Sequence, residues 1–452
     1  MEPNRLPLRE QARLVRERKL SPVELVEAHL AEIRARNPGI NAFVEVFEEE
    51  ALAAARAAAE AEPRGVLHGV PITIKDSFDI AGKPTLCGSR LRRDHRAGRD
   101  STAVRRLREA GAILLGKTNT PEFLYNWETD NAVTGRTNNP FDAARTSGGS
   151  SGGEAAAIAA FCSAGGIGSD GGGSIRFPAH CCGIAGLKPT PGRVSAAGHF
   201  PEIAHPGGLL GVGGPMARDA ADLRVLFEVL AGYDFEDPFS APVPLRAAEV
   251  SGMRVGVMED GWPGVPVSGV VRDAVRSAAD ALARLGFAVE AFSPKGMTRA
   301  PAVWEFFFVD VPVPFTRRMI EGREHETHWT GTEMVRRCEG KPEPTGREIV
   351  EMLAVRDKLR VSMLEQMEGY AVLLLPPCAV QAFPHRQREF GTSGRTIEYL
   401  EAMAPLTPFN LFGMPGLVIP WTVSDGLPCG VQFAAAPYGE ELLLEIGLHL
   451  AR

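Results

Sequence analysis

A serine that follows three consecutive glycines is the residue in this sequence best placed for covalent chemistry. In the stretch "GSDGGGSIRFP" (168–178), Ser174 comes directly after Gly171–Gly173. A serine hydroxyl attacks a carbonyl only when a base removes its proton and when hydrogen-bond donors await the oxyanion. Glycines leave backbone N–H groups without side-chain obstruction. The stretch therefore predicts a nucleophilic serine beside a ready-made oxyanion hole.

Two residues could supply the base that such a serine requires. His180 lies six residues further along the chain, but a lone histidine here is equally consistent with a buried structural residue. Lys75 ends the apolar stretch "VPITIK" (70–75), where loss of hydration would favour the neutral amine that a base requires. The alternative for Lys75 is a surface position paired with Asp76. The residues alone leave this choice open.

Three other motifs suggest different chemistry but fit their patterns less well. Residues 166–171 match a dinucleotide-binding fingerprint, yet an alanine-rich helix precedes them and no acidic residue lies between 171 and 201. Ser150 lies in a pattern typical of a nucleophile elbow, but the preceding "NNPFDAARTS" predicts a loop instead of a strand. "HETH" (325–328) spaces its histidines by three residues where a zincin motif needs four, so a solvated helix end is favoured over a metal site.

The glycine-rich region must be positioned by surrounding helices and strands, which the hydrophobic pattern locates. Thirteen glycines fall within residues 147–192, and the interleaved apolar residues predict ordered, buried loops instead of a flexible linker. Helical and strand patterns alternate around this region, as is typical of α/β proteins. We expect strands near 41–47, 70–75, 112–117, 253–258, 287–292, 370–376 and 416–421, and helices near 22–36, 48–62, 101–111, 266–285, 344–368 and 438–450. The pattern predicts one α/β domain with a mostly buried sheet and helices on both faces.

Composition and charge argue against several other classes of protein. The 452 residues carry 49 Lys+Arg against 56 Asp+Glu, a net charge of −7, and no basic stripe of the kind that direct nucleic-acid binding requires. No apolar run reaches the length of about 18 residues that predicts a transmembrane helix. The charged start of the chain does not resemble a secretory signal. Seven scattered cysteines without a CxxC pair favour a reduced, cytoplasmic protein.

Several longer motifs resemble those of the amidase signature family. The block "GGSSGGEAAAIAAFCSAGGIGSDGGGSIRFPAHCCGIAGLKPTPGRV" is similar to the family's glycine- and serine-rich hallmark. "GVPITIKDSF" and "GKTNTPEF" precede it, "GRTNNPFDAARTSGGSSGGE" leads into it, and "PFNLFGMPGLVIPW" follows near the end. The resemblance covers nearly the whole chain and is densest over 65–195. It implies a single amidase domain over residues 1–452, with a large mixed, mostly parallel sheet of about eleven strands covered by helices on both faces. A variable substrate-pocket region is implied near 240–410.

The resemblance also implies a catalytic triad of two serines and a lysine. Ser174 matches the family's nucleophile, Ser150 matches the bridging serine beside a cis peptide bond, and Lys75 matches the base. Oxyanion donors are implied at the backbone N–H groups of Gly171, Gly172, Gly173 and Ser174, and supporting hydrogen bonds at Ser151, Asp170 and Arg176. The sequence departs from the family at Gly171, where a residue with a side chain is usual. We therefore expect a looser loop, which would lower activity or suit a bulkier acyl group.

The family resemblance leads us to expect an amidohydrolase that forms an acyl-enzyme and needs neither a metal nor an organic cofactor. The expected partner is a small-molecule amide with a hydrophobic, aryl or fatty group, and a homodimer is compatible with the sequence. The alternative is the glutaminase-type component of a tRNA-dependent amidotransferase, which would act in a complex with protein and tRNA. The motifs discriminate only weakly between these two.

The segment "NTPEFLYNWETDNAV" suggests where the substrate would bind. Leu124, Tyr125 and Trp127 are candidates to line an acyl channel, although bulky residues at this spacing would equally suit the core. The region 295–345 is a candidate lid or second pocket wall. Its run Phe306–Phe308 would also suit ordinary core or a protein interface.

Overall fold

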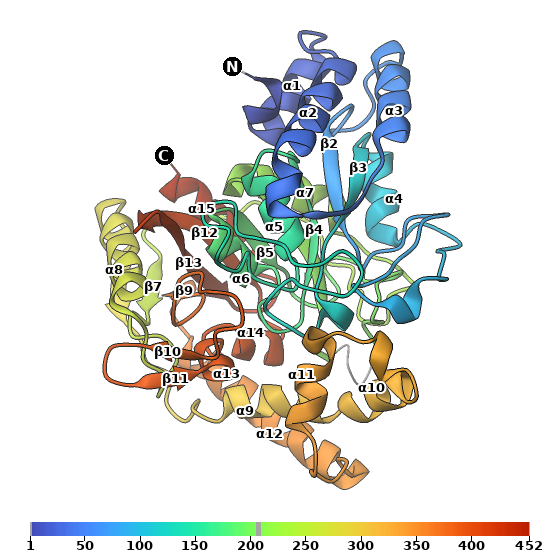
Figure 1. Ribbon diagram of the computed structural model, residues 1–452. Coiled ribbons are helices and arrows are strands. Elements are labelled where there is room, and N and C mark those ends of the chain that lie inside the picture. Colours follow the sequence, from blue (N-terminus) through green and yellow to red (C-terminus); the bar gives the residue numbers. More distant parts are fainter. Residues whose placement is uncertain (1, 205–208, 452) are drawn as a thin grey trace.

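The computed structural model describes residues 2–204 and 209–451, and one large sheet forms its centre (Figure 1). Eleven strands form this sheet in the order β1-β3-β2-β4-β6-β5-β12-β13-β9-β7-β8. They are β1 (Phe43–Val46), β2 (Pro71–Lys75), β3 (Ile113–Thr118), β4 (Gly165–Asp170), β5 (Ala185–Lys188), β6 (Val212–Ala217), β7 (Arg254–Val257), β8 (Ala288–Ala291), β9 (Val372–Leu375), β12 (Gly416–Ser424) and β13 (Leu427–Ala435). β10 (Glu389–Gly391) and β11 (Thr396–Glu398) form a separate two-stranded sheet.

The strand directions confirm a mixed sheet, whereas the expected predominance of parallel pairs is wrong. β2 lies parallel to β3 and β4, and β7 lies parallel to β8 and β9. The other six neighbouring pairs among the described strands are antiparallel. A buried apolar run in the sequence does not show whether a strand pairs parallel or antiparallel with its neighbour, whereas a tight turn between two strands does. Between β12 and β13, Asp425 and Gly426 both have positive φ, which suits a tight hairpin turn and imposes an antiparallel pair.

Helices flank the sheet, and within the described residues none is long and apolar enough to cross a membrane. They are α1 (Leu8–Arg16), α2 (Pro22–Ile40), α3 (Glu48–Glu60), α4 (Thr102–Glu109), α5 (Gly152–Ala159), α6 (Arg176–Cys182), α7 (Ala220–Leu230), α8 (Gly269–Arg284), α9 (Ala300–Glu305), α10 (Val313–Ile320), α11 (Trp329–Arg337), α12 (Gly346–Gln366), α13 (Tyr399–Ala402), α14 (Thr407–Leu411) and α15 (Glu440–Leu450). Successive residues of β12 point to opposite faces: Leu417 lies toward Gly447 of α15, and Val418 lies toward His180 of α6. The predicted coverage of both faces is confirmed.

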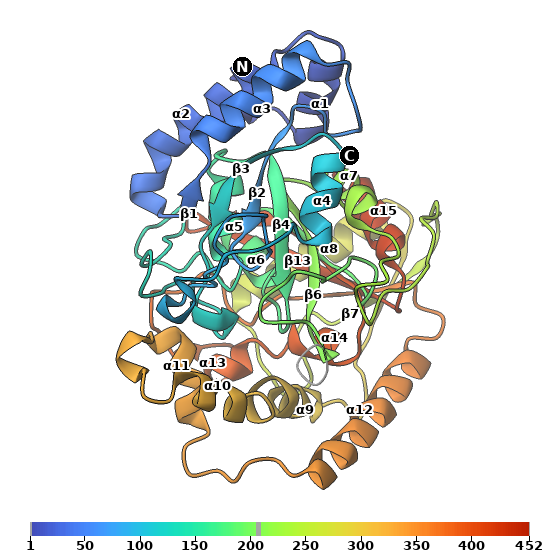
Figure 2. The ribbon, with the colours of Figure 1, turned by 90° about the vertical axis from the view of Figure 1, so that its right-hand side faces the viewer.

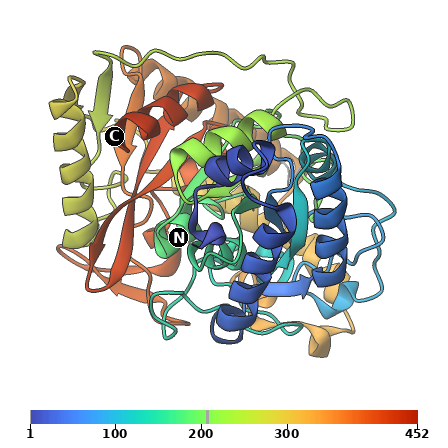
Figure 3. The same cartoon turned by 90° about the horizontal axis from the view of Figure 1, so that it is seen from above.

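Two groups of helices lie on opposite sides of the molecule. α1–α3 lie together on one side, and α9–α12 lie together on the other (Figures 1 and 2). Seen from above, α8 lies at one margin and α3 lies toward the opposite side (Figure 3). This matches the sheet order, in which β8 and β1 are the two edge strands. The predicted elements all correspond to observed ones, although α2 continues through Pro38 to Ile40 instead of ending near residue 36.

The neighbouring strands β2 and β4 bring together the segments that carry the candidate chemistry. They are parallel neighbours, with Thr73 opposite Gly166. Their carboxyl ends, at Lys75 and Asp170, therefore lie at the same edge of the sheet. Both strands are buried along their whole length. A charged group at this edge must consequently be paired or shift toward its neutral form.

Candidate active site

Lys75, the last residue of β2, is buried and faces two serine hydroxyls. Its Nζ lies 2.7 Å from Ser150 Oγ and 2.9 Å from Ser169 Oγ, and it donates to the Ser169 carbonyl oxygen at 3.2 Å. Burial removes water from the ammonium ion and lowers the pKa of Lys75 to about 7, from an ordinary value of 10.5. Much of the amine is then neutral near pH 7, as a general base requires. The surface alternative is excluded, because Asp76 pairs with the buried Lys117 at 2.8 Å.

Ser150 reaches Lys75 from the tight loop that precedes α5. The peptide bond between Gly149 and Ser150 is cis. A Cβ atom at Gly149 would lie 2.7 Å from the backbone carbonyl carbon of Trp127, so a larger residue would displace the chain. Glycine is therefore required here because the backbone of another segment approaches so closely.

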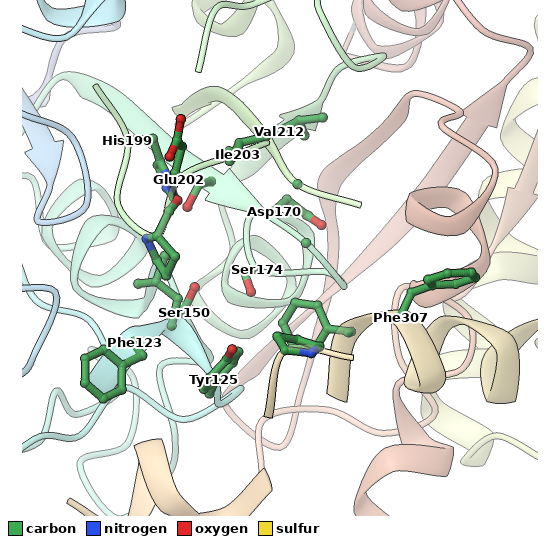
Figure 4. Close-up of a pocket in the computed structure, with 17 residues that line it drawn as sticks. Phe123, Tyr125, Ser150, Asp170, Ser174, His199, Glu202, Ile203, Val212 and Phe307 are labelled. Carbon is green, nitrogen blue, oxygen red and sulfur yellow. Dashed lines mark hydrogen bonds between the residues drawn. The ribbon is translucent and has the colours of Figure 1, made fainter. Parts of the chain in front are cut away.

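Ser174 lies just ahead of α6 and lines the same pocket as Ser150 (Figure 4). Its carbonyl oxygen accepts a hydrogen bond from the Ser151 N–H at 3.1 Å, which ties the two serine-bearing loops together. Among the described residues, no hydrogen bond joins the Ser174 hydroxyl to Ser150 or to another group. Catalytic hydrogen bonds are often long without substrate and shorten in the reacting complex. The Ser150 and Ser174 hydroxyls thus share a pocket, but no hydrogen bond connects them in this structure.

The three glycines ahead of Ser174 form a loop with no room for side chains. Gly173 has φ +112°, a region that favours glycine, and a Cβ atom at Gly172 would lie 2.2 Å from Trp304 Cζ2. Within the described part of the chain, the N–H groups of Gly171, Gly172 and Ser174 make no hydrogen bond. These three N–H groups are therefore available to an oxyanion.

The prediction that the Gly173 N–H is an oxyanion donor is wrong, because Asp170 already binds it. The Gly173 N–H donates to Asp170 Oδ1 at 2.6 Å, so this donor is already committed within the loop. Asp170 also pairs with Arg176, whose Nε lies 3.0 Å from Oδ2, and both side chains are fully buried. Burial alone would raise the pKa of Asp170, but the Arg176 charge outweighs it and holds the pKa well below its usual range. A fixed carboxylate thus shapes the glycine loop.

The remaining supports come partly from the predicted residues and partly from the distant C-terminal third. Ser151 Oγ donates to the Ser169 carbonyl oxygen at 3.3 Å. Arg176 donates to Gln432 Oε1 at 2.7 Å and to Asn410 Oδ1 at 2.5 Å. Sequence reasoning missed both of these partners. Asn410 lies in the quoted stretch "PFNLFGMPGLVIPW", which was a usable signal, whereas nothing in the sequence distinguished Gln432.

The pocket beside Ser174 is largely apolar and aromatic. Its lining comprises Phe123, Leu124, Tyr125, Ser150, Ser169, Asp170, Gly171, Ser174, His199, Pro201, Glu202, Ile203, Gly211, Val212, Phe307, Phe308 and Pro312 (Figure 4). Leu124 and Tyr125 both line this pocket, and their role in an acyl channel stays a prediction. The region 295–345 contributes a wall through Phe307, Phe308 and Pro312.

Trp127 does not line this pocket, which corrects its predicted role. Its side chain is buried, and the indole Nε1 donates to the Gly172 carbonyl oxygen at 3.0 Å. Trp127 therefore supports the glycine loop through this hydrogen bond and does not line the surface that a substrate would contact. A bulky residue near a pocket motif can pack on either side of the loop, and the sequence does not distinguish the two.

His180, the other candidate base, is held elsewhere. Its Nδ1 accepts the Gly430 N–H at 3.0 Å, and its Nε2 lies 3.1 Å from the Val380 carbonyl oxygen. Burial lowers the pKa of His180 to about 4. Both ring nitrogens are therefore used in packing α6 against the sheet, and His180 is a structural residue.

The weaker motifs also receive structural explanations. The dinucleotide-like residues 166–171 form most of β4 itself, so they are not a turn that follows a strand. In the "HETH" segment, His328 precedes α11 and accepts the Thr330 N–H at 3.4 Å. Among the described residues, no group of three or more His, Cys, Asp or Glu side chains is placed to hold a metal ion.

Glu154 is a buried carboxyl near Lys75 that sequence reasoning did not single out. The hydroxyls of Thr73 and Thr118 donate to its two oxygens at 2.5 Å and 2.7 Å. Burial raises the pKa of Glu154 to about 7, while these hydrogen bonds and the Lys75 charge oppose the shift. The negative charge of Glu154 in turn favours the protonated form of Lys75. It was detectable as the single acidic residue in the early part of the glycine-rich block.

Comparisons with known proteins identify sequences and structures that this chain resembles over nearly its whole length. A family model described as Amidase matches residues 24–444. An indoleacetamide hydrolase of Bradyrhizobium diazoefficiens is 35% identical over 96% of this chain and 84% of its own length. The A subunit of the glutamyl-tRNA(Gln) amidotransferase of Chloroflexus aggregans is 37% identical over 95% of this chain and 92% of its own length. The crystal structure of a bacterial aryl acylamidase superposes with a TM-score of 0.86 at 28% identity, covering 99% of this chain and 96% of that one.

Proposed function

The chain belongs to the amidase signature family, and we propose that it is a stand-alone amidohydrolase that cleaves a carboxamide through an acyl-enzyme on Ser174. One observation carries this proposal. Lys75 is a buried amine with a pKa lowered to about 7, it lies 2.7 Å from Ser150 Oγ, and Ser150 lines the same pocket as Ser174. A lysine in this state can take the role that histidine has in other serine hydrolases.

In the first half of the proposed reaction, Ser174 Oγ attacks the carbonyl carbon of the amide. The Ser174 proton passes to Ser150, whose own proton passes to neutral Lys75. The free N–H groups of Gly171, Gly172 and Ser174 stabilise the negative charge that develops on the carbonyl oxygen. The C–N bond then breaks, and the same relay returns a proton to the departing ammonia or amine. An ester on Ser174 remains.

In the second half, a water molecule repeats this sequence. Lys75, again neutral, accepts the water proton through Ser150, and the resulting hydroxide attacks the ester carbonyl. The oxyanion is held by the same N–H groups, the C–O bond to Ser174 breaks, and the proton returns to Ser174 Oγ. The products are a carboxylic acid and the free enzyme.

The pocket supports a hydrophobic substrate with an aryl or fatty group. Tyr125 and Phe308 present aromatic surface to the pocket that Ser174 lines, and among the pocket-lining residues Glu202 and Asp170 are the only acidic ones. Asp170 is already paired with Arg176. An indoleacetamide hydrolase and an aryl acylamidase among the similar proteins point in the same direction. We therefore favour linear amides with an aromatic group over short polar amides.

The alternative is the A subunit of a glutamyl-tRNA(Gln) amidotransferase, which is favoured by the comparable identity of that relative. The glutaminase role would require the pocket to hold the charged groups of glutamine. The lining offers mostly apolar side chains, which supports the stand-alone interpretation.

The deciding experiment is an amide-library screen on the protein purified alone. We expect hydrolysis of aryl-substituted carboxamides with release of ammonia or amine, and a loss of at least about a thousandfold in Ser174→Ala and Lys75→Ala. Full activity in either variant would contradict the mechanism. If glutamine were the single amide hydrolysed, and if its hydrolysis required an added companion protein, the amidotransferase alternative would be favoured.

A further inference from the structure

We propose that Trp304 is a positioning residue for the oxyanion hole, and that it does so by fixing the direction of the Gly172 N–H. This inference rests on the proposed acyl-enzyme reaction and adds a residue from outside the glycine-rich block. Trp304 belongs to α9 and is buried, and its indole Nε1 donates to the Gly171 carbonyl oxygen at 2.8 Å. The two residues are 133 positions apart in the chain.

The effect on catalysis follows from the planarity of the peptide bond. The Gly171 carbonyl and the Gly172 N–H belong to one peptide plane, and in a trans peptide they point in opposite directions. A donor that holds the carbonyl oxygen therefore also fixes the N–H. Among the described residues this N–H has no partner of its own, so Trp304 supplies the hydrogen bond that orients this peptide.

The next two peptides of the loop are held differently. The Gly172–Gly173 peptide is fixed at both ends, because Trp127 donates to its carbonyl oxygen at 3.0 Å and its N–H donates to Asp170 at 2.6 Å. The Gly173 carbonyl oxygen accepts the Phe177 N–H at 2.7 Å, so α6 itself orients the Ser174 N–H. Of the three peptides between Gly171 and Ser174, the Gly171–Gly172 peptide is thus the one that combines a free N–H with a side chain as its carbonyl partner; the preceding Asp170–Gly171 peptide shares this arrangement, because Asn410 Nδ2 donates to the Asp170 carbonyl oxygen at 3.0 Å.

The indole of Trp304 is itself held firmly between aromatic neighbours. It stacks on Phe308 with a centroid distance of 4.6 Å and an interplanar angle of 17°, and it lies 5.6 Å from the ring of Trp127. Its far edge fills the space that a side chain at Gly172 would need. Phe308 also lines the substrate pocket. The pocket wall and the oxyanion loop therefore share one aromatic stack, which the helical segment after residue 300 supplies.

The test is Trp304→Phe, which keeps an aromatic ring and removes the indole donor. Misdirecting one oxyanion donor should lower kcat by roughly ten- to a hundredfold while KM changes less than about threefold. Trp127→Phe removes the same kind of donor from a peptide that Asp170 still holds, so we expect a smaller loss. The matched control is Trp262→Phe: Trp262 is buried, and its Nε1 donates to the Met297 carbonyl oxygen at 3.0 Å, away from the pocket.

A second readout separates positioning from general damage. An arylalkyl boronic acid can form a tetrahedral adduct with Ser174 Oγ and place an oxygen in the oxyanion hole, whereas the corresponding carboxylic acid product binds without such an adduct. In Trp304→Phe, the inhibition constant of the boronic acid should rise by about the same factor as kcat falls. The inhibition constant of the carboxylic acid product should stay within about threefold of the wild-type value.

These outcomes also distinguish the two proposals. Wild-type turnover that Ser174→Ala abolishes, together with unchanged kcat in Trp304→Phe, would overturn the inference about Trp304 alone. The inference would also be overturned if kcat fell equally in Trp304→Phe and Trp262→Phe and if the boronic acid and the product both bound more weakly by the same factor. A wild-type protein that hydrolyses no amide and forms no adduct at Ser174 would overturn both.

Discussion

Lys75 Nζ lies 2.7 Å from Ser150 Oγ, and both side chains are almost completely buried. An amine in this position lacks the hydration that stabilises an ammonium ion in water. Among the residues that the structure describes it also has no direct ion pair with a carboxylate: Asp76 is paired with Lys117, and Asp170 with Arg176. The protonation of Lys75 is therefore the point at which solution pH acts on the proposed relay.

The first prediction is that kcat/KM rises as the pH increases through about 7 and levels off above it. Only the neutral amine can accept a proton, and the neutral form predominates above the pKa, which burial lowers to about 7. The measurement is the initial rate at low substrate concentration from pH 5 to 9. A rate that is constant, or that falls over this range, would show that Lys75 is not the base.

The second prediction concerns Glu154, which modifies the Lys75 base. Its charge favours protonated Lys75, so Glu154→Gln should lower the pKa of Lys75 and move the acidic limb of the pH profile to lower pH. Because the two charges interact and both groups titrate near pH 7, the acidic limb belongs to the pair.

Glu440→Gln provides the control for this shift. Glu440, the first residue of α15, is also a buried carboxyl, but it accepts the Thr190 N–H and does not line the pocket. Its substitution should leave the position of the acidic limb unchanged. An acidic limb that stays in place in Glu154→Gln, or shifts upward, would contradict the assigned interaction.

Much of the fold could be predicted because buried strands and amphipathic helices leave a strong hydrophobic pattern. Strand direction could not, since it depends on connections such as the hairpin turn at Asp425–Gly426. The chemistry of the site was partly visible as well. Lys75 and His180 were both reasonable bases until the structure placed one beside Ser150 and the other against Gly430.

The supports of the site were less accessible to sequence reasoning, for a physical reason. Trp304 contacts Gly171, Asn410 contacts Asp170, and Gln432 contacts Arg176, each across a long separation in the chain that no local spacing reports. Gly173 shows that a contact with a near neighbour in the chain can also be missed. Its bare N–H looked free in the sequence, yet the neighbouring Asp170 carboxylate already holds it.

The third prediction concerns the stability that the Asp170–Arg176 pair provides. Arg176→Met removes the charge that compensates a fully buried carboxylate, which typically costs about 3–5 kcal/mol in the free energy of unfolding. Urea denaturation monitored by tryptophan fluorescence at pH 7.5 measures this loss. Arg254→Met, which breaks an exposed pair with Glu290, should change stability little. Equal stabilities of the two variants would contradict a structural role for the buried pair.

The last prediction concerns Gly171, the departure from the family pattern. From the sequence we expected that the absence of a side chain here would loosen the loop, which would lower activity or suit a bulkier acyl group. The structure indicates a different reason for glycine: a Cβ atom at this position would lie 2.9 Å from Phe308 Cε2. Phe308 cannot move freely, because it stacks on Trp304 and lies 6.0 Å from the ring of Tyr125.

Gly171→Thr should therefore lower kcat/KM for an aryl amide by about tenfold or more, since either the loop or the aromatic wall must shift. Phe308→Ala alone should raise KM, because it removes pocket surface, and should also lower kcat, because it removes the ring on which Trp304 stacks. The double variant should be more active than Gly171→Thr, because the colliding ring is gone. Steady-state kinetics of the four proteins give the coupling between the two positions. If Gly171→Thr turned out to be faster than the wild type, or if the effects of the two substitutions simply multiplied, the aromatic wall would not be what requires glycine at residue 171.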